Sequence, residues 1–249
     1  MDKITVTGMV ISATPIGDFD KRIVLLTKER GKIAAFAKGA RRPKSTLMAG
    51  TRPFTFGEFE IYEGRTSYNV MSVNVKNYFD ELSRDVEGAC YGFYFLELAD
   101  YYGRENVDGS ETLNLLYQSF RALLKHNIKN TLIRRIFELK IMTINGEYPE
   151  MFKCIGCGKE NERFFYSIPS AGLVCTTCME KRSGIRDINV STIYTFQYVI
   201  STGIEKLYTF DVSDDVLREF SDIMNRHMQI CIDGEFKSVE LIDGISWLK

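Results

Sequence analysis

Four cysteines are the residues of this chain whose types and spacing point most directly to chemistry. Cys154 and Cys157 form one CxxC pair, Cys175 and Cys178 form a second, and 17 residues separate the two pairs. Two such turns can place four thiolates in a tetrahedron around Zn²⁺. Because four protein sulfurs leave no open coordination position, we expect one structural zinc ion per chain. Two disulfides, or four unrelated buried thiols, are the alternatives.

A second group of residues suggests a surface that binds an anion. Residues 38–45 read KGARRPKS, the densest basic run in the chain, and the glycine and proline exclude a helix there. Arginine and lysine on a barrel surface bind the phosphates of nucleic acids without strict sequence preference. A solvated loop is the alternative. The candidate DNA-binding residues are Lys28, Arg30, Lys32, Lys38, Arg41, Arg42, Lys44, Arg65, Arg134 and Arg135.

Further basic and aromatic residues are expected on or near this surface. The hairpin tip that carries Lys28, Arg30 and Lys32 is expected on the same side of the barrel as the basic run. Arg134 and Arg135 lie in an apolar helix and are not expected both to face the core, so one pairs with Glu138 and the other extends the basic surface. Among the aromatic residues, Tyr62 and Tyr68 are better placed to stack on bases than Phe54, Phe56 and Phe59, which are expected to be buried.

Motifs that would indicate an enzyme are absent from the sequence. There is no GxxxxGK[ST], GxGxxG, HExxH or GxSxG motif, and the HxE and PCxxC elements of zinc deaminases are missing. His126 is expected at a helix end and His227 at the edge of a helical core, and neither position suggests a metal ligand or a catalytic base. We therefore predict a protein without catalytic residues.

Composition limits the class of protein. The 249 residues are 45% hydrophobic and 26% charged, which is typical of a globular protein. Residues 1–80 contain 13 Lys and Arg against 8 Asp and Glu, whereas the remainder is acidic, so an anionic partner is expected at the N-terminal part. The sequence lacks an export signal or a bilayer-spanning stretch, and a thiolate site suits a reducing compartment, so we predict a cytoplasmic location.

The first 80 residues are patterned as five strands. Alternating apolar runs near residues 4–15, 21–28, 32–38, 53–62 and 67–75 predict a small closed barrel. The OB-fold is the five-stranded option, and an SH3-like barrel is the alternative. A β-bulge at Gly57 would bring Phe54, Phe56, Phe59 and Ile61 onto one face.

Helical periodicity begins at Tyr78. One helix is expected from there to Gly103, a second begins at a capping box of Asp108 and Glu111, and a third is capped by Asn130. Helices resume at 191–203 and 213–234. The predicted architecture is α+β and multidomain: an OB-fold at 1–79, an all-α domain at 80–149 and 183–249, and a zinc-binding knuckle inserted at 150–182.

The order of these parts resembles the RecO family of bacterial recombination and DNA-repair mediators. The resemblance rests on LLTKERGKIAAFAKGARRPKS at 25–45, PFTFGEFEIYEGR at 53–65 and RRIFELKIMTINGEYPEMFKCIGCGK at 134–159, and it covers essentially the whole chain. It implies an N-terminal OB-fold and a helical domain carrying the zinc element. Some members of this family lack the metal cysteines, whereas this chain has all four.

The resemblance also implies a function. Such proteins bind single- and double-stranded DNA, anneal complementary strands, and act in the RecF pathway with RecR to help RecA load onto DNA covered by single-stranded-DNA-binding protein. This implies a cytoplasmic, nucleoid-associated protein. An OB-fold RNA-binding factor with a structural zinc, and a zinc-dependent nucleic-acid hydrolase, remain the alternatives from other classes.

Overall fold

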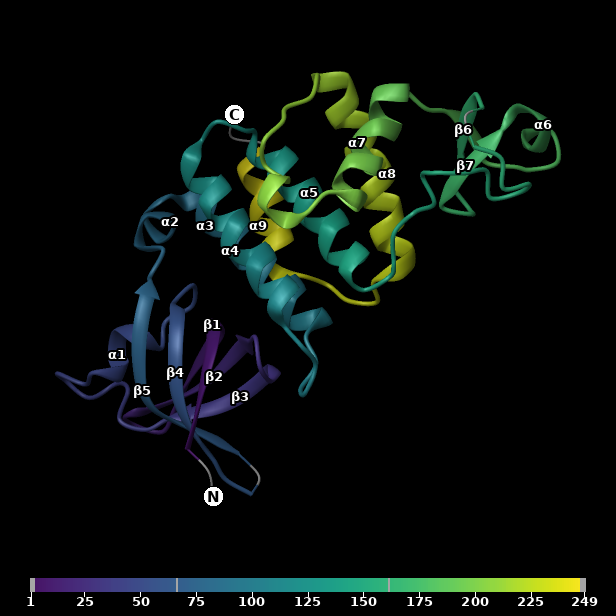
Figure 1. The fold of residues 1–249 in the computed structure, drawn as a ribbon. Helices are drawn as coiled ribbons and strands as arrows, with labels where there is room; N and C mark the ends of the chain where they lie inside the picture. The colour runs from purple at the N-terminus through teal and green to yellow at the C-terminus, as the bar shows by residue number, and fades with distance from the viewer. Residues whose placement is uncertain (1–2, 66, 161, 247–249) are drawn as a thin grey trace. The chain divides into compact units, whose positions relative to one another are not determined.

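The N-terminal part of the protein is a closed five-stranded barrel (Figure 1). The structure, a computed structural model, describes residues 3–65, 67–160 and 162–246. The strands of the barrel are β1 (Lys3–Ile16), β2 (Asp20–Thr27), β3 (Gly31–Ala37), β4 (Phe56–Glu63) and β5 (Tyr68–Asn77), and the short helix α1 (Leu47–Gly50) lies between β3 and β4 in the chain.

The strand order identifies the barrel as an OB-fold, as the sequence predicts. Neighbouring strands follow the order β1-β2-β3-β5-β4, and β4 closes the barrel by pairing with β1. All pairs are antiparallel except β3 with β5, which is parallel. The long strand β1 pairs with two partners, and a register shift between Val10 and Ser12 lets it bend between them. Alternate side chains of the strands, including Val10, Ile23, Leu25, Ile33 and Phe59, fill the interior.

The predicted bulge at Gly57 exists, but its expected effect on the phenylalanines is wrong. The register of β4 with β5 shifts between Phe56 and Gly57, and a Cβ on Gly57 would lie 2.4 Å from the Asn74 carbonyl oxygen. Phe59 lies in the barrel core. Phe54 precedes the strand with φ +70° and packs on Phe93 and Phe120 of the helices instead. Phe59 therefore packs in the barrel core, whereas Phe54 packs in the core of the helices, so the side chains do not share one face.

The chain forms two compact units. The first comprises residues 1–125 and 236–249, and the second comprises residues 126–235. Besides the barrel, the first unit contains α2 (Asp80–Arg84), α3 (Val86–Tyr102), α4 (Ser110–Lys125) and α9 (Lys237–Ser246). Helices α2, α4 and α9 all contact α3, whose buried residues lie between Gly88 and Ala99.

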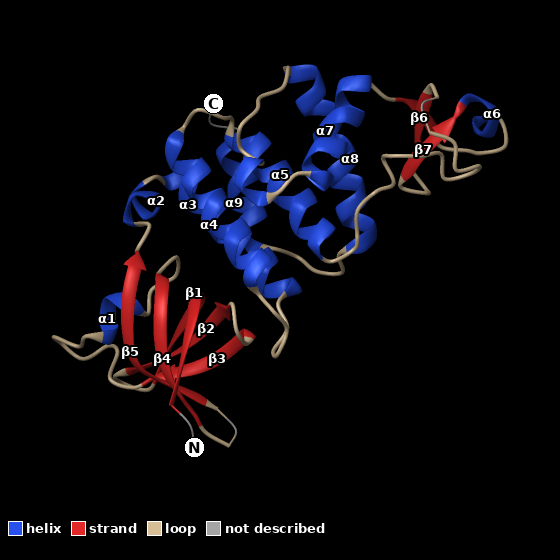
Figure 2. Ribbon diagram, in the orientation of Figure 1, coloured by secondary structure: helices blue, strands red, loops and turns tan. Residues whose placement is uncertain are grey.

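The second unit is a helical group with a small sheet (Figure 2). Its helices are α5 (Asn130–Ile144), α7 (Val190–Ser201), the 3₁₀ turn η1 (Ile204–Lys206) and α8 (Asp214–Cys231). Between α5 and α7, the cysteine segment forms β6 (Phe164–Ser167), β7 (Gly172–Cys175), α6 (Thr176–Met179) and β8 (Ile185–Asp187), with β6 central in the sheet. In the described ranges, no helix has both the length and the apolar character needed to cross a membrane.

Several helix ends differ from the sequence prediction. The single helix expected after Tyr78 is interrupted at Asp85, whose backbone is extended. The Asp85 side chain caps α3 by accepting from the Glu87 N–H. Asp108 accepts from the N–H and hydroxyl of Ser110 instead of forming a capping box with Glu111. Asn130 lies inside α5 and does not cap it; the cap position is Lys129. These differences arise because local hydrogen bonds decide the residue at which each helix begins, and helix propensity alone does not predict that residue.

Candidate nucleic-acid interface and metal centre

The basic run forms an exposed loop that leaves the barrel at the end of β3. Lys38, Arg41, Arg42 and Lys44 are all exposed. The loop is tied to the β1–β2 turn, because the Asp20 carboxylate accepts from the Gly39 N–H at 2.7 Å and the Arg41 N–H donates to the Phe19 carbonyl at 2.8 Å. These bonds give the loop a defined position on the barrel, and its four cations are all exposed to solvent there.

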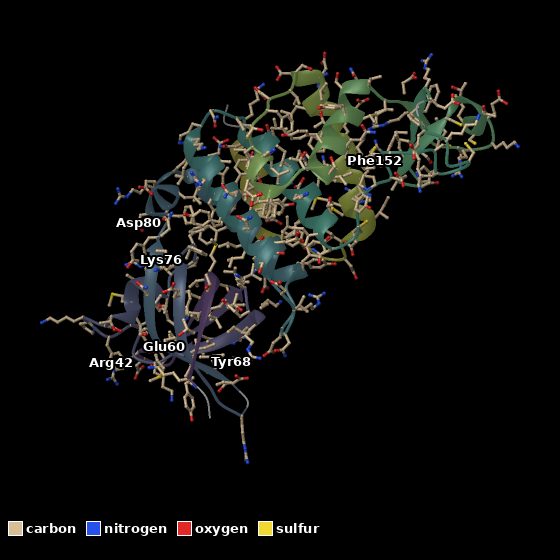
Figure 3. The ribbon with its side chains drawn as sticks, viewed as in Figure 1. Arg42, Glu60, Tyr68, Lys76, Asp80 and Phe152 are labelled. Carbon is tan, nitrogen blue, oxygen red and sulfur yellow. The ribbon has the colours of Figure 1, made fainter. Side chains whose placement is uncertain are left out.

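An exposed aromatic residue, Phe19, lies at the same place and was not among the residues predicted for this surface. Phe19 is 46% exposed, and the guanidinium of Arg42, which Figure 3 labels, stacks over its ring at 5.3 Å from the centroid. Arg41 donates from Nη1 to the Gly17 carbonyl at 3.1 Å. An exposed phenylalanine in the polar turn GDFDKR was the available signal. An aromatic face beside arginine suits stacking on an unpaired base.

Two further cations extend this basic group. The Lys21 ammonium donates to the Thr51 hydroxyl at 3.1 Å, and its pKa is lowered by partial burial and by the nearby charges of Arg52 and Arg41. Arg52 is exposed, and its guanidinium has no hydrogen bond or ion pair within the residues that the structure describes. We call Lys21, Arg41, Arg42, Lys44 and Arg52 the basic face.

The expected contribution of the β2–β3 hairpin tip to this side of the barrel is wrong. In the β2–β3 register Lys21 pairs with Ala37 whereas Thr27 pairs with Gly31, so the tip and the basic loop lie at opposite ends of the hairpin. Arg30 pairs with Glu63 at 3.3 Å, and the Lys32 ammonium contacts the Asp100 carboxylate at 3.3 Å. Lys28 and Arg65 are exposed. A linear pattern of charges does not reveal which end of a hairpin each charge occupies.

Arg134 and Arg135 differ from expectation because both are largely buried against the same carboxylate. Each oxygen of the fully buried Glu138 accepts from one guanidinium, from Arg134 Nε and from Arg135 Nη1, both at 2.8 Å. The expectation that only one of them pairs is therefore wrong. Their contribution to a DNA surface stays a prediction.

The four predicted metal ligands lie together. The sulfurs of Cys154, Cys157, Cys175 and Cys178 are all within 4.8 Å of one another, and all four cysteines are free thiols and not disulfides. Cys157 Sγ and Cys175 Sγ are 3.7 Å apart. Zn–S bonds of about 2.3 Å would place two sulfurs of a tetrahedral site about 3.8 Å apart. The cluster therefore has the dimensions of a site that can hold one metal ion.

The peptide backbone favours the thiolate form at this cluster. Burial opposes ionisation of Cys154, but N–H groups of Cys175, Cys157 and Gly156 outweigh it and lower the pKa of this thiol to about 6. Hydrogen bonds to Cys157 and Cys175 favour the protonated form of the Cys178 thiol and raise its pKa to about 12, and the charge of the Cys154 thiolate adds a smaller repulsion. A divalent cation would offset that repulsion and hold all four groups as thiolates.

Local structure explains why these four residues meet. Cys175 ends β7, and Ile155 joins the two knuckles by donating its N–H to the Leu173 carbonyl at 2.9 Å. The first knuckle is closed by the Gly158 N–H, which donates to the Cys154 carbonyl at 2.8 Å. Val174 and the buried cysteines form a small apolar cluster. Met151, Tyr166 and Leu173 are also buried, but the two knuckles themselves share only this small cluster, so a metal that joins them would add to the stability of the segment.

Comparison with known proteins identifies the family. The family model for the N-terminal region of recombination protein O matches residues 1–79, and the model for its C-terminal region matches residues 83–240. The chain belongs to the RecO family. Its relatives include the DNA repair protein RecO of Acetivibrio thermocellus, 29% identical over the whole of both chains, and that of Alkaliphilus metalliredigens, 31% identical over 97% of this chain and 99% of the relative.

A third RecO relative, from Caldicellulosiruptor saccharolyticus, is 27% identical over the full length of both chains. The match to the RecO family covers the barrel, the helices and the cysteine knuckle alike. These homologues support a role in DNA repair, and the chain spans nearly all of their length.

Proposed function

We propose that this chain is a mediator of DNA repair and homologous recombination in the RecF pathway. In this function it binds single- and double-stranded DNA, anneals complementary strands, and helps RecA load onto single strands covered by single-stranded-DNA-binding protein. The observation that supports the proposal is the basic face beside Phe19 on the OB-fold barrel, in a chain of the RecO family. A cytoplasmic, nucleoid-associated location follows from this function.

The geometry of the basic face accounts for DNA binding by simple electrostatics. Exposed cations neutralise phosphates and release the counterions condensed on DNA, which supplies most of the affinity. Phe19, held beneath Arg42, offers an unpaired base a surface for stacking. Because two neutralised strands at high local concentration anneal without covalent chemistry, no catalytic residue is required.

The cysteine cluster fits a structural zinc ion. Cys154, Cys157, Cys175 and Cys178 would supply all four ligands, which leaves no position for a substrate or an activated water. When bound, the metal would cross-link the two knuckles. This closed ligand set argues against the alternative of a zinc-dependent hydrolase, which needs an open coordination position.

The protein partners follow from the family alone. We expect a RecR-type partner, single-stranded-DNA-binding protein, and RecA acting indirectly. Annealing of protein-coated strands, measured with and without the RecR-type partner, tests this assignment. An RNA-binding factor would use the same basic face, so competition between DNA and RNA oligonucleotides of one sequence separates the two functions.

The direct test reverses charge in the basic loop. The variant Arg41→Glu/Arg42→Glu/Lys44→Glu should bind unrelated DNA sequences more weakly. Each phosphate contact that is lost should lower the slope of log affinity against log salt by about 0.7 for single strands and about 0.9 for duplex. Fluorescence anisotropy at several salt concentrations measures both quantities.

A matched control separates local contact from net charge. The variant Lys206→Glu/Arg226→Glu/Lys237→Glu makes the same change in net charge at three other exposed positions. It should keep the slope of the unmodified protein. If the loop variant folds and retains both affinity and slope, the loop is a solvated surface and the proposed DNA contact is wrong.

A further inference from the structure

A small hollow in the first unit lies directly beside the basic face. It has a volume of 280 Å³, and its lining includes Arg52, Phe54, Tyr78, Asp80 and Phe93. These residues come from the segment before β4, from the turn into α2 and the start of α2, where Figure 3 labels Asp80, and from α3. Pockets for drug-sized ligands measure about 300–1,000 Å³, so this hollow suits a single planar group.

Two aromatic rings in this hollow are exposed, and one of them is held in place by other rings. Phe93 is 43% exposed and Tyr78 is 40% exposed. The ring of Phe93 rests on Phe54 with centroids 4.7 Å apart, and Phe54 in turn packs edge-on against the buried Phe120 at 5.3 Å. An exposed ring backed by a buried aromatic stack keeps its orientation, so it can stack on a ligand without first being ordered.

The backbone has adapted to hold this aromatic stack. Phe54 is buried although its φ of +70° lies in the left-handed region, which costs a residue with a side chain on the order of 1–2 kcal/mol. Gly92 makes room for it, because a Cβ there would lie 2.9 Å from Phe54 Cε1. Strained backbone of this kind persists where surrounding contacts enforce it.

The charges around the hollow select among possible ligands. The Arg52 guanidinium at its edge has no partner within the described ranges. The Lys21 ammonium donates to the neighbouring Thr51 hydroxyl. It is close enough to both arginines that, besides partial burial, the charges of Arg52 and Arg41 lower its pKa. Asp80 inside the hollow would repel a phosphate but can accept hydrogen bonds from the amino groups of a base. A ligand with a neutral planar group and anionic groups on either side matches this distribution.

We propose that this hollow binds one unpaired nucleobase of a single DNA strand, whose flanking phosphates lie on Arg52, Lys21 and Arg41. The proposal rests on the DNA-binding function proposed above and extends the strand's path from the basic loop to α3. Phe93 and Tyr78 provide the stacking faces. The site reads no sequence strictly, because every base offers a π-face.

The test compares two oligonucleotides that carry the same phosphates. One is a 15-nucleotide single strand of mixed sequence, and the other has abasic tetrahydrofuran sites at all positions. Removing a stacking side chain costs about 1–3 kcal/mol per base, equivalent to about 5- to 150-fold in affinity. Phe93→Leu should weaken binding of the normal strand about 5-fold or more and leave the abasic strand and both salt slopes unchanged.

Phe152→Leu is the matched control. Phe152 is 39% exposed and belongs to the second unit. Its replacement should therefore change neither the affinity for the normal strand nor that for the abasic strand. Because Phe93 contacts Phe54, its replacement also changes the packing behind the hollow. A second measurement therefore needs no substitution: the unmodified protein is photo-crosslinked to a strand containing 5-iododeoxyuridine. Mass spectrometry should find the adduct on Tyr78 or Phe93.

Several outcomes would overturn the proposal. The first is that the unmodified protein binds normal and abasic strands with equal affinity. The second is that Phe93→Leu loses affinity for both strands equally, and the third is that the crosslinks lie only on other residues. A folded Phe93→Leu variant that binds both strands normally but loses affinity for a RecR-type partner would assign the hollow to a protein side chain. Failure of the basic-loop variant to alter binding would instead contradict the proposed function itself.

Discussion

At the scale of single residues, His227 shows how burial makes stability depend on pH. Its Nε2 donates to the Glu147 carbonyl at 2.8 Å, whereas Nδ1 is buried and has no partner within the described residues. The ring also faces the Cys231 thiol, 3.7 Å from Nε2. Burial lowers the pKa of His227 below its ordinary value of 6.5, against a smaller opposing effect of Glu147. Protonation at Nδ1 would therefore place a charged ring in the core, and its new N–H would lack an acceptor among the described residues.

We predict that the free energy of unfolding falls as the pH drops below about 6.5. The unfolded chain binds this proton first, so the folded state loses stability by up to about 1.4 kcal/mol per pH unit. His227→Gln keeps a donor for Glu147 and should abolish this part of the pH dependence. Urea unfolding between pH 7.5 and 5.5 measures it.

The second histidine of the chain supplies the control. His126 is exposed just after α4, so His126→Gln should retain the pH dependence of the unmodified protein. If the unfolding free energy of His227→Gln changes with pH as steeply as that of the unmodified protein, another group causes the pH dependence and the burial argument fails for His227.

Residue-scale features were predictable when they depended on neighbours in sequence. The cysteine cluster was predicted because each CxxC turn fixes two sulfurs locally. The shared ion pair was only half predicted, since the i,i+4 spacing reveals Arg134 with Glu138 but not the second guanidinium on the same carboxylate. Phe19 was missed because its partner Arg42 comes from a loop more than 20 residues away.

At the scale of elements, the same limit appears in the barrel. Five alternating runs were sufficient to predict five strands, since alternation depends on residues two apart. They did not reveal that Phe54 leaves the strand and joins the helical core, nor that Lys32 contacts Asp100 near the end of α3. Both facts depend on packing between elements that are distant in sequence.

The cysteine knuckle is the element whose stability should depend most on a metal. Cys175→Ser should release zinc and loosen residues 150–182, because the two knuckles share only a small apolar cluster besides the four sulfurs. The barrel should be largely unaffected, since its core is separate. Metal content and amide hydrogen exchange measure the two effects.

Cys90→Ser is the matched control for this prediction. Cys90 lies alone on α3, outside the four-sulfur cluster, and its replacement should leave the metal bound. Carefully purified protein that contains no metal and has Cys154, Cys157, Cys175 and Cys178 joined as disulfides would contradict the proposed site.

At the scale of the whole molecule, the division of the chain is discontinuous. The sequence groups residues 183–249 with the helical domain, whereas tertiary contacts place 236–249 in the unit that contains the barrel. Phe236 packs on Tyr94 and Tyr101 with ring centroids 5.7 and 6.0 Å away, and the Ser238 N–H donates to Glu97. The last helix therefore completes a unit that begins at the other end of the chain.

We predict that Phe236→Ala destabilises this unit alone. A fully buried phenylalanine costs about 3–5 kcal/mol when truncated, so the partly buried Phe236 should cost about 1–3 kcal/mol. Hydrogen exchange should rise in α3 while residues 164–175 and the metal content stay unchanged. Lys237→Ala, at the exposed neighbouring position, should change stability by less than about 0.5 kcal/mol. Equal loss of protection in both units would show that they unfold together, and α9 would then stabilise the whole chain through one cooperative transition.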